Sequence, residues 1–282
     1  MGQDQELFSA SHTSSHRHNS SFLPIVEPDA AQVHELKNLL HRSHRTVVIT
    51  GAGMSTESGI PDFRSENGFW DDVDLLSMMS DAYLSAHPED FWVHFKKTFM
   101  NPHFMSALPN EGHLALAELA AVGKQVKIFT QNVDGLHQMA GSMNVYELHG
   151  NIRHAYCPNC HSRYGVTHIL AEDVPYCSYY DMKGNECGSV LHTDVVLFDQ
   201  MVRHMDEAFD AVVRADLLLI LGTSLSVDPV ASLPQFISHG HKLAIINLEE
   251  TYMDHRADLV IRASVGRTVS RAVEELLSMP GY

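Results

Sequence analysis

Short apolar runs alternate with amphipathic helical patterns along most of this 282-residue chain. Strands are predicted at 46–50, 126–130, 145–148, 217–221, 243–248 and 259–261. Helical periodicity lies around them, at 30–44, 91–100, 111–122, 206–214, 229–239 and 267–279. Strands that alternate with helices form parallel sheets covered by those helices. We therefore expect an α/β fold built on a Rossmann-like parallel sheet, formed by residues 26–152 and 199–282.

One segment, residues 153–198, interrupts this alternation and contains all four cysteines of the chain. Cys157 and Cys160 form a Cys-x2-Cys pair, and Cys177 and Cys187 follow. This pattern is typical of tetrahedral zinc bound by four thiolates. Two disulfides would suit an exported protein, but the N-terminus lacks a signal-peptide pattern; unligated thiols are the other alternative. We predict a small inserted zinc-binding module, whose zinc is structural because four thiolates leave no position for water.

The bulk properties of the chain exclude several classes of partner. Residues 1–25 are rich in Ser, His and Asn, and are expected to form a disordered tail. The net charge of −16 repels nucleic acid and favours basic partners, although a local basic patch would still be compatible with it. No apolar run approaches the roughly 18–20 residues needed to cross a membrane. We expect a cytoplasmic protein with no membrane partner and no direct contact to nucleic acid.

The stretch GAGMSTESGIPDFR follows the first predicted strand. Gly51 and Gly53 allow close backbone approach, and the N–H groups of residues 52–55 can hold a diphosphate. A ligand-free turn is the alternative for these glycines alone. The spacing is not G-x-G-x-x-G, and no acidic residue ends a second strand about twenty residues later, unlike an ordinary NAD site. Pro61, followed by Phe63 and Arg64, predicts instead a lid that closes over a bound cofactor.

Polar residues also follow the later strands, at the carboxyl ends where α/β folds bind ligands. Asn132 and Asp134 can contact the ribose and carboxamide of a nicotinamide; an Asx-capped loop is the alternative. His149 can act as a general base, although a hydrogen-bonded loop histidine is an equally simple reading in a chain with 20 histidines. Two further strand ends suit phosphate and ribose contacts, through Gly222, Thr223, Ser224, Asn247 and Glu249.

Together these stretches resemble the sirtuin family of NAD-dependent protein deacylases. The likeness covers about residues 30–280, and its elements occur in the family's order: GAGMSTESGIPDFR, TQNVDGLH, LHG, the four cysteines, GTSLSVDP and INLEET. The resemblance implies a Rossmann-like domain and a small zinc module, with NAD and substrate meeting in the cleft between them. It implies NAD as a co-substrate, structural zinc, and an acyl-lysine protein or peptide as partner.

The resemblance assigns roles to the residues at matching positions. His149 would be the general base, and Asn132 and Asp134 would complete the catalytic set. Val196, Phe198 and Val227 would form the acyl-lysine channel and pair with the substrate peptide. The NAD-binding residues would be Gly51, Ala52, Gly53, Thr56, Phe63, Arg64, Gln131, Asn132, Val133, Asp134, Gly222, Thr223, Ser224, Asn247, Glu249 and Val265.

The implied reaction consumes NAD and moves no hydride. The acyl oxygen attacks the nicotinamide ribose carbon, nicotinamide leaves, and His149 takes a proton from a ribose hydroxyl that attacks the imidate carbon. Water then completes release of lysine and O-acyl-ADP-ribose. Mono-ADP-ribosyl transfer and non-catalytic sensing of NAD or ADP-ribose are the alternatives that we weigh against deacylation.

The sequence departs from the family pattern at a few positions. Asp199 and Gln200 follow Phe198 where the family usually has Gly-Glu, so Asp199 is expected to crowd the backbone that binds peptide. LHTDVV, residues 191–196, replaces a run that contains Arg-Pro. The wide Cys177–Cys187 spacing predicts an inserted loop. Residues 65–95 contain no Lys or Arg but include Leu75, Leu76, Met78 and Met79, which favours neutral acyl groups; ordinary helix core is the alternative for this cluster.

Overall fold

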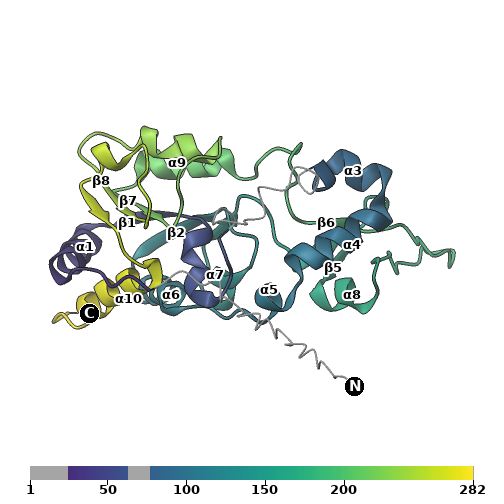
Figure 1. The fold of residues 1–282 in the computed structure, drawn as a ribbon, viewed down its shortest axis with the longest axis horizontal. Coiled ribbons are helices and arrows are strands. Elements are labelled where there is room, and N and C mark those ends of the chain that lie inside the picture. Colours follow the sequence, from purple (N-terminus) through teal and green to yellow (C-terminus); the bar gives the residue numbers. More distant parts are fainter. Residues whose placement is uncertain (1–24, 63–76, 282) are drawn as a thin grey trace, which may run out of the picture.

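A six-stranded parallel sheet forms the larger part of the molecule (Figure 1). The structure is a computed structural model that describes residues 25–62 and 77–281. The strand order is β3-β2-β1-β7-β8-β9. The bounds are Arg45–Thr50 for β1, Gln125–Thr130 for β2, Val145–Glu147 for β3, Leu217–Leu221 for β7, Lys242–Ile246 for β8 and Leu259–Ile261 for β9. Chain order reverses at β1 and β7, so their carboxyl ends form the switch point where such sheets bind ligands.

Helices cover both faces of this sheet, as the Rossmann-like prediction requires (Figure 1). On one face lie α1 (Ala30–Arg42), α6 (Glu111–Ala121) and α10 (Val265–Leu277), whose Leu36, Leu116 and Val269 share one apolar core with β1 and β2. On the other face α9 (Met205–Arg214) and the 3-10 helix η4 (Val230–Phe236) pack against β7 and β8. None of the helices in the described parts of the chain is long and apolar enough to cross a membrane.

The predicted α-helix at 229–239 is wrong in type and length. The chain forms a 3-10 helix over Val230–Phe236, and Pro234 lies inside it. Proline has no N–H to donate and its ring collides with the preceding turn, so an α-helix cannot continue through this position. The other predicted helices exist and differ from the observed ones by a few residues at their ends.

The second part of the molecule contains the cysteine segment and a small antiparallel sheet in the order β5-β4-β6. Its elements are β4 (His154–Tyr156), β5 (Arg163–Gly165), α8 (Val166–Ala171) and β6 (His192–Thr193). Helices α3 (Asp81–Ala86), α4 (Pro88–Phe99) and α5 (Pro102–Ser106) lie beside it (Figure 1). The shorter elements of the larger part are η1 (Ala52–Met54), η2 (Thr56–Ser58), α7 (Leu136–Met139) and η5 (Asp254–Arg256).

Helix α4 joins the cysteine segment to the rest of the chain through one apolar core. Phe91, Trp92 and Phe95 are fully buried, in the same core as Ile169 and Leu191 of the cysteine segment. The Trp92 indole N–H also donates to the Leu191 carbonyl, at 2.7 Å. The sequence placed α3–α5 in the larger domain, whereas their side chains pack with the module. The division at residues 153 and 198 stays a prediction.

Candidate functional site

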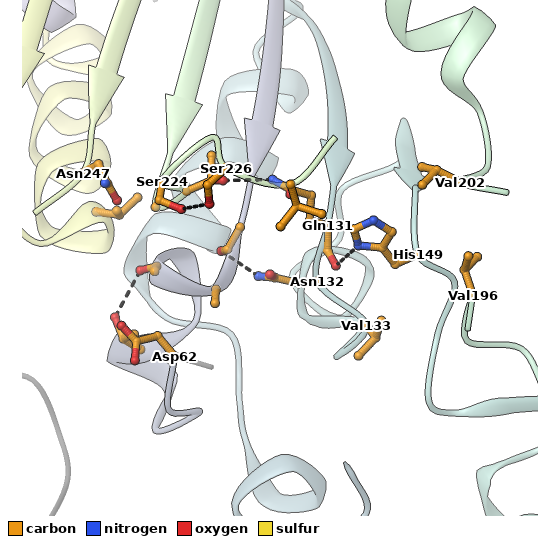
Figure 2. Close-up of a pocket in the computed structure, with 18 of the residues that line it drawn as sticks. Asp62, Gln131, Asn132, Val133, His149, Val196, Val202, Ser224, Ser226 and Asn247 are labelled. Carbon is orange, nitrogen blue, oxygen red and sulfur yellow. Dashed lines mark hydrogen bonds between the residues drawn. The ribbon is translucent and has the colours of Figure 1, made fainter. Parts of the chain in front are cut away.

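A cavity of about 1300 Å³ lies along the carboxyl ends of the parallel strands. Most of the residues that the sequence selected line it: Gly51, Ala52, Gly53, Thr56, Gln131, Asn132, Val133, His149, Val196, Phe198, Gly222, Thr223, Ser224, Val227, Asn247, Glu249 and Val265. In Figure 2, Gln131 and Asn132 lie between Ser224 and Asn247 on one side and His149 and Val196 on the other. Phe63 and Arg64, the predicted lid, lie outside the described residues, as do positions 1–24 of the predicted tail and Leu75 and Leu76.

Three glycines fix the floor of the cavity at the sheet's switch point. A Cβ on Gly51 would lie 2.7 Å from Thr223 Cβ, and one on Gly53 would lie 2.8 Å from Gly222 Cα. Gly222 has a φ of +61°, and a Cβ there would lie 2.4 Å from the Gly53 carbonyl carbon. The Gly53 N–H donates to the Gly222 carbonyl, at 2.9 Å. The loops after β1 and β7 therefore interlock, and only glycine fits at these positions.

This interlock corrects one expectation about the glycine-rich loop. The N–H groups of residues 52–55 were expected to be free for a diphosphate. Instead Gly53, Met54 and Ser55 donate to the carbonyls of Gly222, Gly51 and Ala52. The glycines allow the loops after β1 and β7 to approach each other closely, not a ligand to approach the backbone. The 3-10 helices η1 and η2 turn the loop after β1 back on itself.

Asn132 is held rigidly at the centre of the wall. Its side-chain N–H₂ donates to the Gly51 carbonyl at 3.0 Å and to Ser55 Oγ at 3.1 Å. Ser55 in turn donates to Asp134 Oδ2 at 2.7 Å, and Leu136 N–H donates to the other carboxylate oxygen at 2.9 Å. Asp134 is buried behind the wall and is linked to Asn132 through the Ser55 hydroxyl. Burial raises the pKa of Asp134, while its hydrogen bonds oppose that shift.

His149 lies two residues beyond the end of β3 and faces the cavity (Figure 2). Its Nδ1 is 3.0 Å from the Gln131 carbonyl oxygen. A carbonyl oxygen only accepts, so Nδ1 carries the proton in the neutral ring and Nε2 has a free lone pair. Burial lowers the pKa of His149, partly offset by the bond to Gln131, so the neutral form predominates at neutral pH. The arrangement presents a base to the cavity.

The far end of the cavity is formed by residues after β8 and at the start of α10. Asn247 follows β8 directly and its side-chain N–H₂ donates to the Glu249 carbonyl, at 3.0 Å. Glu57 of η2 accepts from the N–H groups of Gly266 at 2.6 Å and Arg267 at 3.1 Å. Its carboxylate therefore caps α10, whose own N-cap residue makes no side-chain cap bond. Burial raises the pKa of Glu57.

The opposite end is apolar and reaches the cysteine module. Besides Val196 and Phe198, it is lined by Met79, a member of the Leu/Met cluster noted in the sequence, and by residues that sequence reasoning did not select: Phe99, Val195, Leu197, Met201, Val202 and Met205. The Val196 N–H donates to the His149 carbonyl at 2.8 Å, which ties the module's last segment to the strand end. The apolar stretch VVLF, residues 195–198, carried the signal for some of these residues, but only Val196 and Phe198 were selected from it.

Asp199 does not crowd the cavity as expected. Its carboxylate accepts from the N–H groups of Asp81 at 2.7 Å and Ala82 at 3.1 Å, and so caps α3. The Asp81 backbone bond lowers the pKa of Asp199. Gln200 adds a bond to Asp81 Oδ1 at 2.8 Å. The Asp-Gln pair thus anchors this loop to α3 and turns the carboxylate away from the cavity, which Gln200 but not Asp199 lines.

Other lining residues also escaped the sequence reasoning, among them Ile25, Glu57 and Asp228. Ile25 was assigned to the tail, but it lines the cavity beside the residues that precede α10. The N–H of its neighbour Val26 donates to Ser264 Oγ, and the Ser264 N–H donates to the Val26 carbonyl, each at 2.9 Å. Glu57 and Asp228 lay inside quoted motifs without being assigned a role. Only their position within those motifs could have pointed to them.

The four cysteines come together in a geometry that fits one zinc ion. Cys157 Sγ lies 3.6 Å from Cys187 Sγ, and Cys160 Sγ lies 3.4 Å from Cys177 Sγ. All four ligand atoms lie within 4.8 Å of one another. A tetrahedron with zinc–sulfur bonds of about 2.3 Å has edges of about 3.8 Å, which matches this spacing. Disulfide bonds, at about 2.05 Å, do not.

A hairpin accounts for the wide spacing of the second cysteine pair. Isolated bridges pair Tyr176 with Val190 and Tyr180 with Glu186. At the tip, Asp181 Oδ1 accepts from the N–H groups of Lys183 and Asn185, which closes the turn. The predicted inserted loop is therefore an ordered hairpin that returns Cys187 to the other three thiols.

The chain is similar to known proteins over most of its length. The sequence model described as the Sir2 family matches residues 51–229. The NAD-dependent protein deacetylase of Bacillus subtilis (strain 168) is 52% identical over 233 residues, which are 82% of this chain and 94% of that protein. A solved complex of Sir2 with a p53 peptide and NAD⁺ has a TM-score of 0.71 at 38% identity, covering 86% of this chain and 97% of the other. A Sir2 variant with deacetylated p53 peptide and 3′-O-acetyl-ADP-ribose has a TM-score of 0.74 at 37% identity, with the same two coverages.

Proposed function

This chain belongs to the Sir2 family, and on that premise we propose that it is an NAD-dependent protein-lysine deacylase. The acyl group of a modified lysine would pass to the ribose of NAD, with release of nicotinamide. The cavity exceeds the roughly 300–1,000 Å³ of an ordinary ligand pocket, which suits a site that takes two substrates at once.

The proposal rests on the position of His149 relative to Asn132 and Gln131. Neutral His149 would accept, on Nε2, the proton of a ribose hydroxyl as that hydroxyl attacks the acyl carbon. The Gln131 carbonyl would fix the ring and stabilise the charge that develops on it. Asn132, held by Gly51 and Ser55, would hold the nicotinamide ribose without needing to reorganise.

The two ends of the cavity would divide the substrates between them. Gly222, Thr223, Ser224, Asn247, Glu249 and Val265 would contact the adenosine half of NAD, with Ala52 and Thr56 nearer the diphosphate. The acyl-lysine would enter from the apolar end, between Phe198 and Val227. The acyl chain would meet Val196 and its apolar neighbours, so acetyl and longer neutral acyl groups suit the channel and acidic ones do not.

The cysteine cluster would hold structural zinc. Four thiolates complete the tetrahedral shell and leave no position for a reacting group, so the ion would stabilise the module and take no part in acyl transfer. A cytoplasmic location stays a prediction from the sequence.

One assay tests deacylation against the two alternatives. The protein is incubated with NAD and an acetyl-lysine peptide, and nicotinamide, peptide mass and O-acetyl-ADP-ribose are measured together. Deacylation gives nicotinamide, deacetylated peptide and O-acetyl-ADP-ribose in equal amounts. Nicotinamide with an ADP-ribosylated peptide or protein would indicate ADP-ribosyl transfer instead. NAD binding without nicotinamide release would leave only a sensor.

A further inference from the structure

Two buried histidines lie next to each other behind the wall of the cavity, and the reaction described above does not use them. His113 of α6 and His137 of α7 are 0% and 1% exposed, and their ring centroids are 4.7 Å apart. One nitrogen of each ring, His113 Nε2 and His137 Nδ1, has no hydrogen-bond partner among the described residues. Buried polar atoms are rarely left unpaired, so these two nitrogens require an explanation.

The partners of His137 fix where its proton lies. Its Nε2 is 3.1 Å from Thr50 Oγ1, and Thr50 Oγ1 donates its one proton to Thr130 Oγ1 at 2.8 Å. Thr50 must therefore accept from His137, and in the neutral ring the proton is on Nε2. The unpartnered Nδ1 of His137 is then an acceptor.

His113 has the complementary requirement. Its Nδ1 accepts from the Asn110 N–H, at 3.3 Å. Asn110 Oδ1 is also close, at 3.0 Å, but it already accepts from the N–H groups of Gly112 and His113. With Nδ1 as acceptor, the neutral ring carries its proton on Nε2. Burial lowers the pKa of His113 to about 4 and that of His137 well below its usual value, so both rings are neutral at pH 7.

We propose that His113 Nε2–H donates to His137 Nδ1, directly or through one buried water, and that this pair positions Asn132. The unpartnered donor of one ring and the unpartnered acceptor of the neighbouring ring would satisfy each other. The bond would complete one directional series of donors, from Asn110 N–H through His113, His137 and Thr50 to Thr130 Oγ1.

Both ends of this series reach the cavity wall. Thr130 Oγ1, at one end, also accepts from the Asn132 N–H at 3.0 Å. At the other end, the Asn110 side chain donates to the Met54 carbonyl in η1 at 2.8 Å. The pair thus connects the loop after β1 to the loop after β2, and reversal of either tautomer would break bonds on both sides. His113 and His137 are positioning residues, since neither lines the cavity.

The tautomers can be read directly in solution. Long-range ¹H–¹⁵N spectra of imidazole-labelled protein at pH 7 should show both rings neutral, each with its proton on Nε2. A scalar coupling between His113 Nε2 and His137 Nδ1 would identify a direct bond, and its absence a bridging water. A proton on Nδ1 of either ring, or a charged ring at pH 7, would overturn the proposal. This readout does not depend on activity.

The positioning role rests on the proposed function and is tested by kinetics. His137→Phe should lower kcat/KM for NAD about ten- to a hundredfold, because a displacement of about 1 Å near reacting groups can cost this much. The KM for peptide should change less than threefold. His137→Gln, which keeps an N–H₂ donor toward Thr50, should recover part of the loss.

His241→Phe is the matched control, because His241 is half-buried, has an Nδ1 without a partner among the described residues, and does not line the cavity. It should leave kcat/KM unchanged. If His137→Phe lowers the melting temperature but not kcat/KM, the pair is only structural and the positioning role is wrong. If the wild-type protein has no deacylase activity at all, the proposed function fails, while the tautomer measurement still decides the bond between the rings.

Discussion

The six-stranded sheet and the cysteine module are stabilised in different ways. The sheet has a large apolar core on each face, and every residue of its central strand β7 is buried. The module has strands of two or three residues, too few to form a core of their own. Four cysteines and the aromatic side chains of α4 hold it instead.

This difference separates the proposed catalytic residues from the proposed substrate channel. Asn132 and His149 lie on loops of the self-supporting sheet, where hydrogen bonds to neighbouring strand ends fix them. The module supplies one apolar wall through Val196 and its neighbours. Loss of the module should therefore abolish acyl-lysine binding while the sheet stays folded.

Removal of zinc should have the largest effect. Structural zinc sites contribute roughly 10–16 kcal/mol to folding, so Cys187→Ser or chelation should unfold the module and abolish activity. Circular dichroism should still report the helices and strands of the larger part. Elemental analysis of the reduced wild-type protein should give one zinc per chain. Ser189→Ala, beside Cys187 but not a ligand, should keep zinc and activity; a zinc-free protein with full activity would contradict the prediction.

Loss of the base should break the chemistry and leave the fold. His149→Ala should lower kcat about 10²–10⁴-fold while NAD still binds. Because burial lowers the pKa of His149, wild-type activity should stay high as pH falls to the ordinary histidine value, and decline only below it as the ring is protonated. His154→Ala, which changes an exposed side chain of β4, should leave both kinetics and pH profile unchanged. A His149→Ala enzyme within a few-fold of wild type would remove His149 from the mechanism.

The module's wall should select acyl groups by charge. A succinyl carboxylate in a channel lined by Val195, Val196 and Leu197 would lose its hydration without gaining a cation, because the described lining contains no Lys or Arg. We expect kcat/KM for succinyl-lysine to be at least about a hundredfold below that for acetyl-lysine on the same peptide, a cost of several kcal/mol. Acetyl, butyryl, myristoyl and succinyl peptides should be compared in one series. Succinyl as the best substrate would be incompatible with this channel.

Loss of the Asp199 carboxylate, which anchors the module's last segment to α3, should have the smallest effect. Asp199→Ala removes a helix cap, which typically costs about 0.5–2 kcal/mol of the free energy of unfolding. Because the pKa of Asp199 is lowered in the folded protein, this stabilisation is present above the unfolded-state pKa and is lost as pH falls through the folded one. Thermal unfolding of the wild type and the variant at pH 7 and pH 3 measures the contribution of the cap and its loss at low pH. Asp210→Ala, which changes an exposed side chain of α9, is the control; equal melting temperatures for the two variants would mean that the cap contributes nothing.

The sequence predicts the sheet better than the module for a physical reason. The strands of the sheet are continuous apolar runs that end in polar loops, so both their positions and the residues after them, such as Asn132 and His149, can be recognised locally. The helix at 88–99 buries Phe91, Trp92 and Phe95, but nothing in the sequence says which part of the molecule covers them. Leu191, whose carbonyl accepts from the Trp92 indole N–H, lies 99 positions along the chain from Trp92.

Long-range partners also explain the errors at the site. Asp199 was expected at the peptide groove, but the N–H groups that hold it belong to residues 117 and 118 positions earlier. The N–H groups of Gly53 to Ser55 were expected to bind a ligand. Instead, the Gly53 N–H donates to the carbonyl of Gly222, which lies far along the chain. Residue type limits what a side chain can bind, but the partner that it does bind depends on the folded arrangement.

The burial of Trp92 gives the protein an internal optical reporter. The chain has two tryptophans, and Trp92 lies in the core shared by α4 and the cysteine segment, with its indole N–H bonded to the Leu191 carbonyl. The emission of a buried indole moves to longer wavelength when water reaches it. In a Trp70→Phe background, fluorescence would therefore follow the loss of this smaller part separately from the ellipticity of the sheet and its helices. One titration with a chelator, followed by both signals, would show whether the two parts of the molecule unfold together or one after the other.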